Sequence, residues 1–453
     1  MRKIFTLCCL AAATCANAQT LTEIKEAEEA GGVMVQTISN NGKYVGGMTF
    51  AQQLFLHDLQ SGKSVILEPE DDFGAEVRGI SNDGIGIGYN GPAITVDMSG
   101  NAKIIEQSTE EYYCLGESIT DDGKIMTGSV VNLAMSDLDD WQYKACYWEN
   151  GKLAMLPSPT SEEMTFPVAG SSAKRISADG SVILGHLVDN MSSFPAIIWK
   201  RVGNEYQLDT ICKGLFAPSI YNEELGDYEP REEPYPLFQF AALSANGKYV
   251  ALNVARYESY YDEDMDQTFT FPGETRIAIY NTETKEIQEI VIDGSTGIEE
   301  GTSCAANAIA NDGTVIGYTG DGFMQPRQAI ILKAGEKQPK LMAEEFSSIE
   351  QIATFDELGM NSPCAITGDG RYIAGFAMIP YEMEIEGEVF ETSICEAYVI
   401  DREGDPTAIS STVKTAKKAT EYFTVDGRKV AAPVKGLNII KSADGTTKKV
   451  FVK

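Results

Sequence analysis

Alternating carboxylates in one segment have the spacing of a metal-binding loop. Asp262, Asp264 and Asp266 occupy every second position of an acidic run. In a calcium-binding loop, the first, third and fifth positions supply oxygen ligands in this way. The sixth position, where such a loop needs glycine, is Gln267, and the glutamate of position twelve comes one residue late, as Glu274. The pattern indicates either a partial Ca²⁺ site or a solvated acidic loop, and no other cofactor is expected.

Aromatic residues are interleaved with acids in the same and similar segments. The rings that we expect to contact a ligand are Trp141, Tyr143, Tyr257, Tyr260, Tyr261 and Tyr381. Rings with polar neighbours suit stacking on sugars or gripping a peptide, and acids can fix hydroxyls or cationic side chains. The alternative is that these rings only pack long loops onto a scaffold. Their chemistry predicts a glycan, peptide or protein ligand and names no reaction.

Residues for catalysis are few. The chain has two histidines, His57 and His186, which is too few for a His-ligated zinc site and offers little to a Ser-His-Asp peptidase. His186, expected to follow a strand and open a loop, is the one candidate base. Carboxylate-pair glycoside hydrolysis stays open, but nothing in the sequence selects a pair. We expect a non-enzymatic binding protein, with a carbohydrate-active hydrolase or lyase as the alternative.

A recurring phrase shows what positions these residues. An apolar residue, a small one, a variable one, Asn or Asp, and Gly follow one another seven times, ending at Gly42, Gly84, Gly123, Gly180, Gly247, Gly313 and Gly370. Asn-Gly or Asp-Gly between apolar runs favours a β-hairpin with a two-residue type I′ turn, in which both central residues have positive φ. A small residue in the following strand, as in 43–47 and 124–128, suits close packing.

A second hairpin follows each phrase, from 54–67 in the first copy to 396–409 in the last. Two hairpins make a four-stranded sheet, which cannot bury both faces alone. Seven such sheets arranged radially bury each face against the next blade. The sequence therefore predicts an all-β protein, a seven-bladed β-propeller of four-stranded antiparallel blades over 19–410. A β-sandwich or solenoid of similar hairpins is the alternative.

The long connections should fall on one face of this propeller. With strands A to D running outward in each blade, the A–B and C–D turns share one face, and the B–C and D–A connections share the other. Every long insertion lies in the second class, at 129–143, 186–194, 209–240, 255–274, 343–362 and 376–394. Long loops on a rigid scaffold usually carry function. Replacing Gly84 or Gly313 in the short turns should therefore cost stability rather than activity.

The N-terminal segment predicts export. Arg2 and Lys3 precede an apolar stretch over 4–15 and the small-residue site Ala16-Asn17-Ala18, the pattern of a signal peptide (1–18) cleaved near Ala18. We expect no transmembrane segment, because no other run is long and apolar enough. Six cysteines remain after cleavage, and their positions in the expected strands favour free thiols over three disulfides. We expect a monomer.

The C-terminal segment differs sharply in charge. After a polar linker over 411–420, the strand-rich segment 421–453 is basic, and together they hold ten Lys or Arg against three Asp or Glu, in a chain whose net charge is −31. Such a charge break marks a separate module. The strongly acidic remainder makes nucleic acid and anionic membranes poor partners.

Two resemblances refine this picture. Tyr422, the run 426–430, the run 435–440 and the closing run 449–453 resemble a type A C-terminal sorting domain of the type IX (Por) secretion system of Bacteroidetes, with Asn438 where that family often has Tyr. The resemblance implies the type IX secretion machinery as a partner and a secreted or outer-membrane-surface location.

The blade phrase is similar to the extracellular propeller repeats called HAF repeats. It matches them best at 175–203 and 306–336. That similarity implies the propeller fold and no activity, because a fold of this kind hosts many functions.

Overall fold

The computed structural model describes the chain in segments. These are residues 19–27, 30–70, 72, 74–105, 112–132, 143–159, 170–188, 196–210, 219–222, 227–230, 237–262, 267–320, 327–358, 360–385, 388–404, 421–424, 429–430, 436–441 and 447–452. The chain divides into a unit of Ala18–Glu403 and a second unit that includes Gly404–Lys453. Each unit is described by itself.

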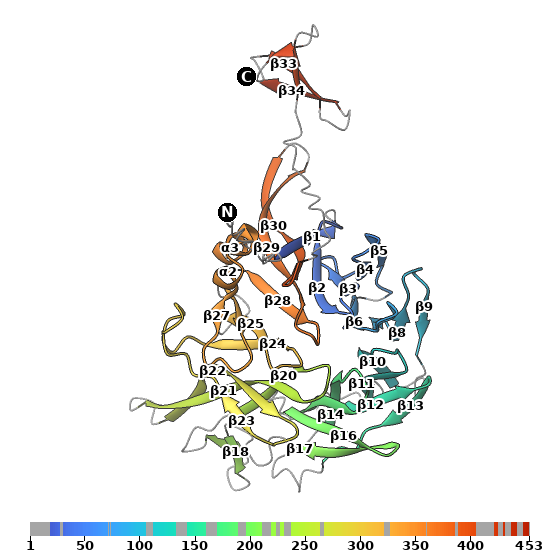
Figure 1. Ribbon diagram of the computed structural model, residues 1–453, viewed down its shortest axis with the longest axis vertical. Helices are drawn as coiled ribbons and strands as arrows, with labels where there is room; N and C mark the ends of the chain where they lie inside the picture. The colour runs from blue at the N-terminus through green and yellow to red at the C-terminus, as the bar shows by residue number, and fades with distance from the viewer. Residues whose placement is uncertain are drawn as a thin grey trace, which may run out of the picture. The chain divides into compact units, whose positions relative to one another are not determined.

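The described part of the first unit contains seven four-stranded antiparallel sheets, which follow one another around a ring (Figure 1). The first blade contains β2 (Val33–Ile38), β3 (Tyr44–Thr49), β4 (Leu54–Asp58) and β5 (Lys63–Leu67), and the second contains β6 (Ala75–Ile80), β7 (Gly86–Asn90), β8 (Ala93–Val96) and β9 (Ala102–Ile104). The third contains β10 (Tyr112–Ile119), β11 (Ile125–Asn132), β12 (Tyr143–Glu149) and β13 (Lys152–Met155), and the fourth contains β14 (Gly170–Ile176), β15 (Val182–Val188), β16 (Ala196–Val202) and β17 (Glu205–Thr210).

The remaining blades follow the same plan. The fifth contains β20 (Leu237–Leu243), β21 (Tyr249–Asp262), β22 (Gln267–Asn281) and β23 (Ile287–Glu289), and the sixth contains β24 (Cys304–Ile309), β25 (Val315–Thr319), β26 (Ala329–Leu332) and β27 (Lys340–Leu341). The seventh contains β28 (Asn361–Ile366), β29 (Tyr372–Ile385), β30 (Glu388–Asp401) and β1 (Thr20–Ile24). The predicted seven-bladed propeller is confirmed.

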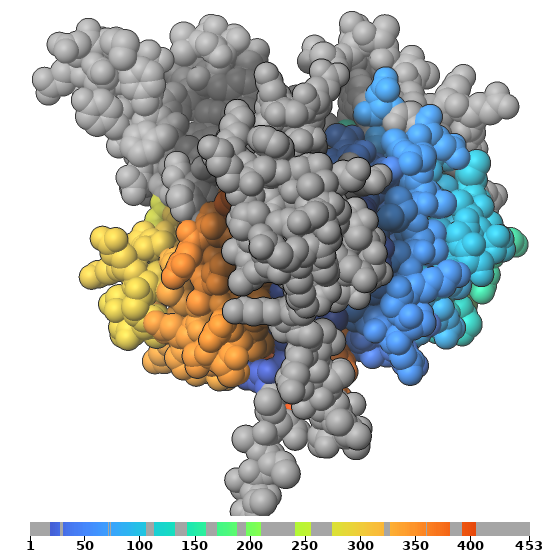
Figure 2. Space-filling model, turned by 90° about the horizontal axis from the view of Figure 1, so that it is seen from above, coloured from blue at the N-terminus to red at the C-terminus, as the bar shows by residue number. Residues whose placement is uncertain are grey.

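The N-terminal strand closes the ring. β1 pairs antiparallel with β30, with Thr20 opposite Asp401 and Ile24 opposite Ala397. The expected hairpin over 396–409 is therefore wrong in its second strand, because the outer edge of β30 is taken by a strand from the other end of the unit. Figure 2 shows the early blades (blue to cyan) and the late segments (yellow to orange) on opposite sides of its view.

The seven phrase turns are real, but they are not of the predicted type I′. In each, the glycine N–H donates to the carbonyl of the residue three positions earlier, as from Gly42 to Ser39 at 2.8 Å. Only the glycine has positive φ, between 70° and 96°, whereas the Asn or Asp before it does not. Side chains explain the difference, because Ser39 Oγ accepts from the Tyr44 N–H and Asn41 Oδ1 accepts from the Lys43 N–H. The result is a type I turn followed by a glycine in the left-handed region.

A continuous ring of hydrogen bonds, here called the turn ring, joins these seven turns. Each turn donates one N–H to an oxygen of the turn in the next blade. The donors and acceptors are Asn41 to Asn82 Oδ1, Asn82 to Asp121 O, Asp121 to Ala178 O, Ala178 to Ala245 O, Asn246 to Asn311 Oδ1, Asn311 to Gly368 O, and Gly368 to Asn40 Oδ1. The last bond returns to the first blade and closes the circle.

Every innermost strand also carries a β-bulge at the same place. The residue skipped by the pairing lies six positions before the turn glycine in all seven blades: Gln36, Arg78, Glu117, Lys174, Ala241, Asn307 and Cys364. Six of the seven second strands place a glycine beside the bulge. A Cβ there would overlap a carbonyl oxygen of the inner strand, that of Glu76 in the case of Gly88 and of Leu115 in the case of Gly128. This close approach confirms the packing role predicted for the small residue.

Several expected loops are instead regular structure. The segment 255–274 is largely the extension of β21 and β22 into one long hairpin, and 376–394 is largely the extension of β29 and β30. The segment 209–240 holds a two-stranded sheet of β18 (Ser219–Asn222) and β19 (Asp227–Pro230). The segment 343–362 holds most of α2 (Met342–Glu345) and all of α3 (Glu350–Glu357). In the extended hairpins, aromatic and polar residues alternate, which is typical of a strand. The many charged residues in the same segments favoured the loop prediction.

Apolar side chains of neighbouring blades form the core, with Trp148, Trp199 and Tyr398 among the largest fully buried residues. The five described cysteines are free thiols, as predicted, and Cys212 lies outside the described residues. The second unit contains one four-stranded sheet, ordered β32 (Lys429–Val430), β31 (Glu421–Thr424), β33 (Gly436–Lys441) and β34 (Thr447–Val452). Among the helices of the described segments, none has the length and apolar character needed to cross a membrane.

Ring closure by β1 predicts a stability difference between two residues of one strand. Ile24 is 4% exposed in a core cluster with Ala397 and Val399, whereas Thr22 is exposed. Ile24→Ala should lower the free energy of unfolding by about 2–4 kcal/mol because it leaves a cavity between blades. Thr22→Ala should change it by less than about 0.5 kcal/mol. Urea unfolding of the two variants checks this, and equal effects would contradict closure by β1.

Candidate functional site

The bulges line the central channel with polar side chains. One cavity of about 140 Å³ is bounded by inner-strand residues of all seven blades, and a second of about 300 Å³ adjoins it. Six of the seven bulge residues line one or both cavities: Gln36, Arg78, Glu117, Lys174, Asn307 and Cys364. A bulge turns its extra residue out of the pleat and re-aims its side chain. The channel is therefore the place where the repeats present chemically different groups.

Charged residues gather on one side of the channel, in the second, third and fourth blades. Arg78 Nε donates to Glu76 Oε2 at 2.9 Å, and Arg78 Nη1 donates to Glu117 Oε1 at 2.6 Å. Lys174 Nζ donates to the same Glu117 oxygen at 2.5 Å. Glu76 and Glu117 are both buried. These ion pairs connect three blades across their inner strands.

The pKa shifts follow from this arrangement. Burial alone would raise the pKa of Glu117, but the charges of Lys174 and Arg78 outweigh it, so the pKa lies below its ordinary value of 4.5. Burial would lower the pKa of Arg78, but Glu117 and Glu76 raise it further than burial lowers it. Glu117 is thus held as an anion by its cationic neighbours.

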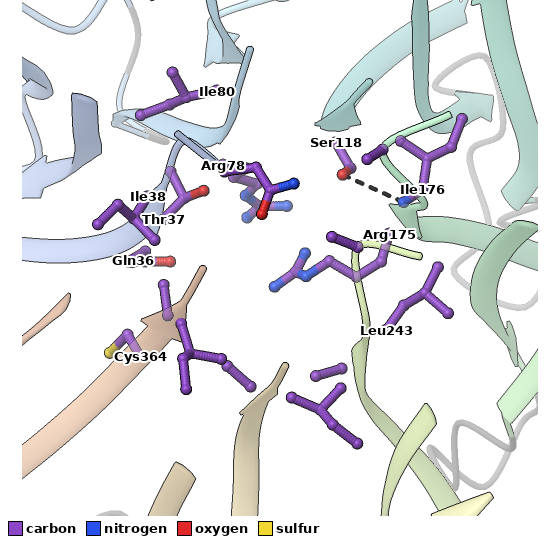
Figure 3. Close-up of a pocket in the computed structure, with 18 of the residues that line it drawn as sticks. Gln36, Thr37, Ile38, Arg78, Ile80, Ser118, Arg175, Ile176, Leu243 and Cys364 are labelled. Atoms are coloured by element: carbon purple, nitrogen blue, oxygen red, sulfur yellow. Dashed lines mark hydrogen bonds between the residues drawn. The ribbon is translucent and has the colours of Figure 1, made fainter. Parts of the chain in front are cut away.

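Arg175 adds a cation that these pairs do not neutralise. Its guanidinium reaches into the middle of the first cavity (Figure 3) and also lines the second. Nη1 donates to the Lys174 carbonyl oxygen at 2.8 Å, and no ion pair joins Arg175 to a carboxylate among the described residues. Burial lowers the pKa of Arg175, with Glu117 opposing the shift. The second cavity therefore holds three cations against two carboxylates.

The turn ring borders the opposite end of the first cavity. Asn40, Asp121, Ala178 and Ala245 belong to the phrase turns and line that cavity. Asn40 Nδ2 donates to Asp121 Oδ2 at 3.0 Å, from the first blade to the third. A Cβ at Gly368 would meet Asn311, Asn40 and Ala245 within 3 Å. The turns thus crowd the axis at this end of the channel.

The ligand-binding aromatics predicted from sequence lie mainly on the extended hairpins. Tyr257, Tyr260 and Tyr261 belong to β21, with Tyr260 paired to Phe269 across the hairpin. Tyr381 belongs to β29 and pairs with Thr392. Tyr143 begins β12, opposite Val131 and partly exposed. Trp141 lies outside the described residues, so these assignments stay predictions.

The calcium assignment is not brought to a test. Asp262 ends β21 in register with Gln267, and Asp264 and Asp266 lie outside the described residues. Within the described segments, no group of three or more His, Cys, Asp or Glu side chains is arranged to hold a metal ion.

His186 is not placed where the sequence suggested. It lies inside β15, paired with Ala196, rather than after the strand at the mouth of a loop. It is buried, and burial lowers its pKa to about 3, with the nearby Lys174 adding to the shift. It is therefore a very weak base near neutral pH. His57 lies in β4, where its Nδ1 is 2.8 Å from Ser64 Oγ and burial lowers its pKa.

Sequence reasoning missed the charged channel residues, although a signal for them exists. The position six residues before each turn glycine reads Gln, Arg, Glu, Lys, Ala, Asn and Cys in the seven repeats. A polar, variable residue inside an otherwise apolar inner strand breaks the expected pattern. Such breaks in a repeat indicate where the scaffold presents function.

Comparisons with known proteins add the fold context. No protein family matches the sequence, and no curated protein does. The chain is similar in structure to an oligogalacturonate lyase from Vibrio parahaemolyticus, at 11% identity over 85% of this chain and 97% of that one, with a TM-score of 0.48. It is also similar to the Cps50 (Swd1) β-propeller domain from Myceliophteria thermophila, at 10% identity over 84% and 99%, with a TM-score of 0.42. It is similar as well to TolB from Acinetobacter baumannii, at 12% identity over 81% of this chain and 82% of that one, with a TM-score of 0.33. At these scores the likenesses carry no functional argument, and the seven-bladed fold rests on the strand pairing of the chain itself.

The charge arrangement predicts different effects for two Gln substitutions. Glu117→Gln should destabilise the protein by about 3 kcal/mol, because it leaves Lys174 and Arg78 with reduced compensation. Arg175→Gln should change the free energy of unfolding by less than about 0.5 kcal/mol in either direction, because Arg175 makes no ion pair among the described residues.

The pH dependence gives an independent check of the Glu117 prediction. Because folding lowers the pKa of Glu117, its ionised form stabilises the protein above pH 4.5, and this contribution is lost as the pH falls below that value. The gap between the parent and Glu117→Gln should therefore narrow in acid. Chemical unfolding at several pH values measures it, and a gap that widens in acid would contradict the ion-pair account.

Proposed function

We propose that this chain is an exported, non-enzymatic propeller that binds a ligand at the channel end opposite the turn ring. The observation that carries the proposal is the difference between the two ends of the channel. The phrase turns crowd one end, and the charged cluster lies farther from them along the inner strands, since Glu117 precedes its turn glycine by six residues and Glu76 by eight.

The extended hairpins lie on the same face of the propeller as this channel end, which supports that face as the binding face. β21–β22 and β29–β30 continue past the blade body at their B–C ends, which lie on the side away from the phrase turns. The described aromatic residues predicted to contact a ligand, Tyr143, Tyr257, Tyr260, Tyr261 and Tyr381, lie on these hairpins and on β12. A glycan, a peptide or a protein surface is the class of ligand that such rings with acidic neighbours would hold. Calcium at Asp262, Asp264 and Asp266 would then stiffen the tip of one hairpin.

Binding is favoured over hydrolysis by the state of the channel carboxylates. A glycoside hydrolase of the usual kind needs one carboxyl whose pKa is raised, so that it can donate a proton. Glu117 has the opposite shift, and both Glu117 and Glu76 are bonded to Arg78. The carbohydrate-active hydrolase or lyase remains the alternative that the experiment below distinguishes.

Export through the type IX secretion system is part of the proposal. It is supported by the signal-peptide pattern of 1–18, by the resemblance of 421–453 to a sorting domain, and by the separate four-stranded sheet in that segment. The protein would then act outside the cell or on the outer-membrane surface. The resemblance of the blade phrase to extracellular HAF repeats supports the same proposed location.

Binding by the hairpin face predicts a variant that loses its ligand. The purified protein is screened on glycan and peptide arrays with and without a calcium chelator. Replacing Trp141, Tyr260 and Tyr261 together by Ala should weaken the strongest hit at least about tenfold, because stacking area is lost. A matched control is the triple Ala variant of Ile66, Ile104 and Val202. These are three exposed apolar residues, two on the outermost strands β5 and β9 and one at the end of the third strand β16.

Two results would overturn this proposal. Unchanged binding by the aromatic triple variant would show that the hairpin face is the wrong surface. Turnover of an array polysaccharide by the parent protein would favour the hydrolase or lyase alternative.

A further inference from the structure

We propose that the central channel is a binding site for a single carboxylate group, which is held by Arg175 beside Arg78 and Lys174. This inference rests on the proposed function, since it names the chemical group that enters the channel end opposite the turn ring.

The residues that line the second cavity carry one more positive than negative charge. Arg78 and Lys174 form ion pairs with Glu76 and Glu117. Arg175 makes no ion pair among the described residues and feels those two carboxylates only at longer range. Arg175 is partly buried, and moving a cation out of water without a counter-ion costs free energy that a bound anion offsets. One monoanion neutralises the second cavity, whereas a phosphate or sulfate dianion would leave a net negative charge beside Glu76 and Glu117.

The hydrogen-bonding groups suit a planar carboxylate. Arg175 uses Nη1 to hold the Lys174 carbonyl, which leaves its other N–H donors directed to the cavity. A guanidinium donates two parallel hydrogen bonds to a carboxylate, a geometry that no ammonium offers. The Gln36 side chain lines both cavities and makes no hydrogen bond to the residues that the structure describes, so its amide is available beside Arg175. Figure 3 shows both side chains at the same cavity.

The size and surroundings of the site limit what carries the carboxylate. Cavities of about 140 and 300 Å³ lie at or below the lower end of the range for drug-sized ligands. The chain as a whole carries a net charge of −31, which repels polyanions from its surface. A small molecule with one carboxylate and an otherwise neutral body fits both limits. The channel would thus recognise a sugar acid or an acylated amino acid by the group that they share.

The test is calorimetric titration of the purified full chain with D-glucuronate and with N-acetyl-L-glutamine, which separate the sugar and amino-acid sources of one carboxylate. D-glucose and N-acetyl-L-glutaminamide are the matched neutral compounds, and inorganic phosphate and sulfate are the dianions. We expect at least one carboxylate to bind, its neutral counterpart to bind at least about tenfold more weakly, and neither dianion to bind more tightly.

Variants separate recognition from folding. Arg175→Gln should weaken the carboxylate at least about tenfold while the protein stays folded. Arg201→Gln is the matched control, because Arg201 lies on β16 and pairs with Glu149 at 2.8 Å, away from the channel-lining residues. It should bind as the parent does.

The outcomes distinguish this inference from the proposed function. No carboxylate binding up to about 10 mM, unchanged affinity in Arg175→Gln, equal binding of the neutral compounds, or tighter binding of phosphate or sulfate would each overturn it. If the aromatic triple variant loses the array ligand while Arg175→Gln retains it, the hairpin face binds and the channel site is wrong. If Arg175→Gln alone loses binding, the channel site stands and the hairpin face is wrong.

Discussion

A β-bulge at one fixed position of every innermost strand determines what the channel of this propeller contains. The bulge brings a carbonyl oxygen against the following strand, which leaves room only for glycine in six of seven blades, as at Gly88 and Gly128. The bulge also turns one side chain per blade, that of the bulge residue, out of the regular strand. Six of these seven residues line the channel cavities. The repeat thereby fixes the backbone and leaves the identity of the channel residue free to differ between blades.

The turn ring makes the two ends of that channel unequal. Seven hydrogen bonds pass in one direction from blade to blade and return to the first, while β1 joins the last blade to the start of the unit. One end is crowded by the turns, and the charged cluster lies toward the other. Arg175 lies on the charged side of this division, where it lines both cavities and makes no ion pair with a carboxylate among the described residues.

Features that depend on adjacent residues could be predicted from the sequence, whereas contacts between residues far apart in the chain could not. Asn-Gly and Asp-Gly turns gave the number and order of the blades, because a tight turn is encoded in adjacent residues. The closing strand Thr20–Ile24 was missed because its partner lies about 380 residues away (Thr20 opposite Asp401). The pairing of Glu117 with Arg78 and Lys174 was missed for the same reason, since each comes from a different blade. The long hairpins were predicted as loops because charged residues are frequent in the segments 255–274 and 376–394.

The central claim is that the channel holds one monovalent anion beside Arg175. Anomalous X-ray diffraction from crystals soaked in sodium bromide tests it directly, because bromide is a monoanion that can be located without assumptions about the natural ligand. The account predicts an anomalous peak in the channel within hydrogen-bonding distance of the Arg175 guanidinium, and its absence in Arg175→Gln crystals. Bromide bound only on the outer surface of the parent protein, with none in the channel, would contradict it.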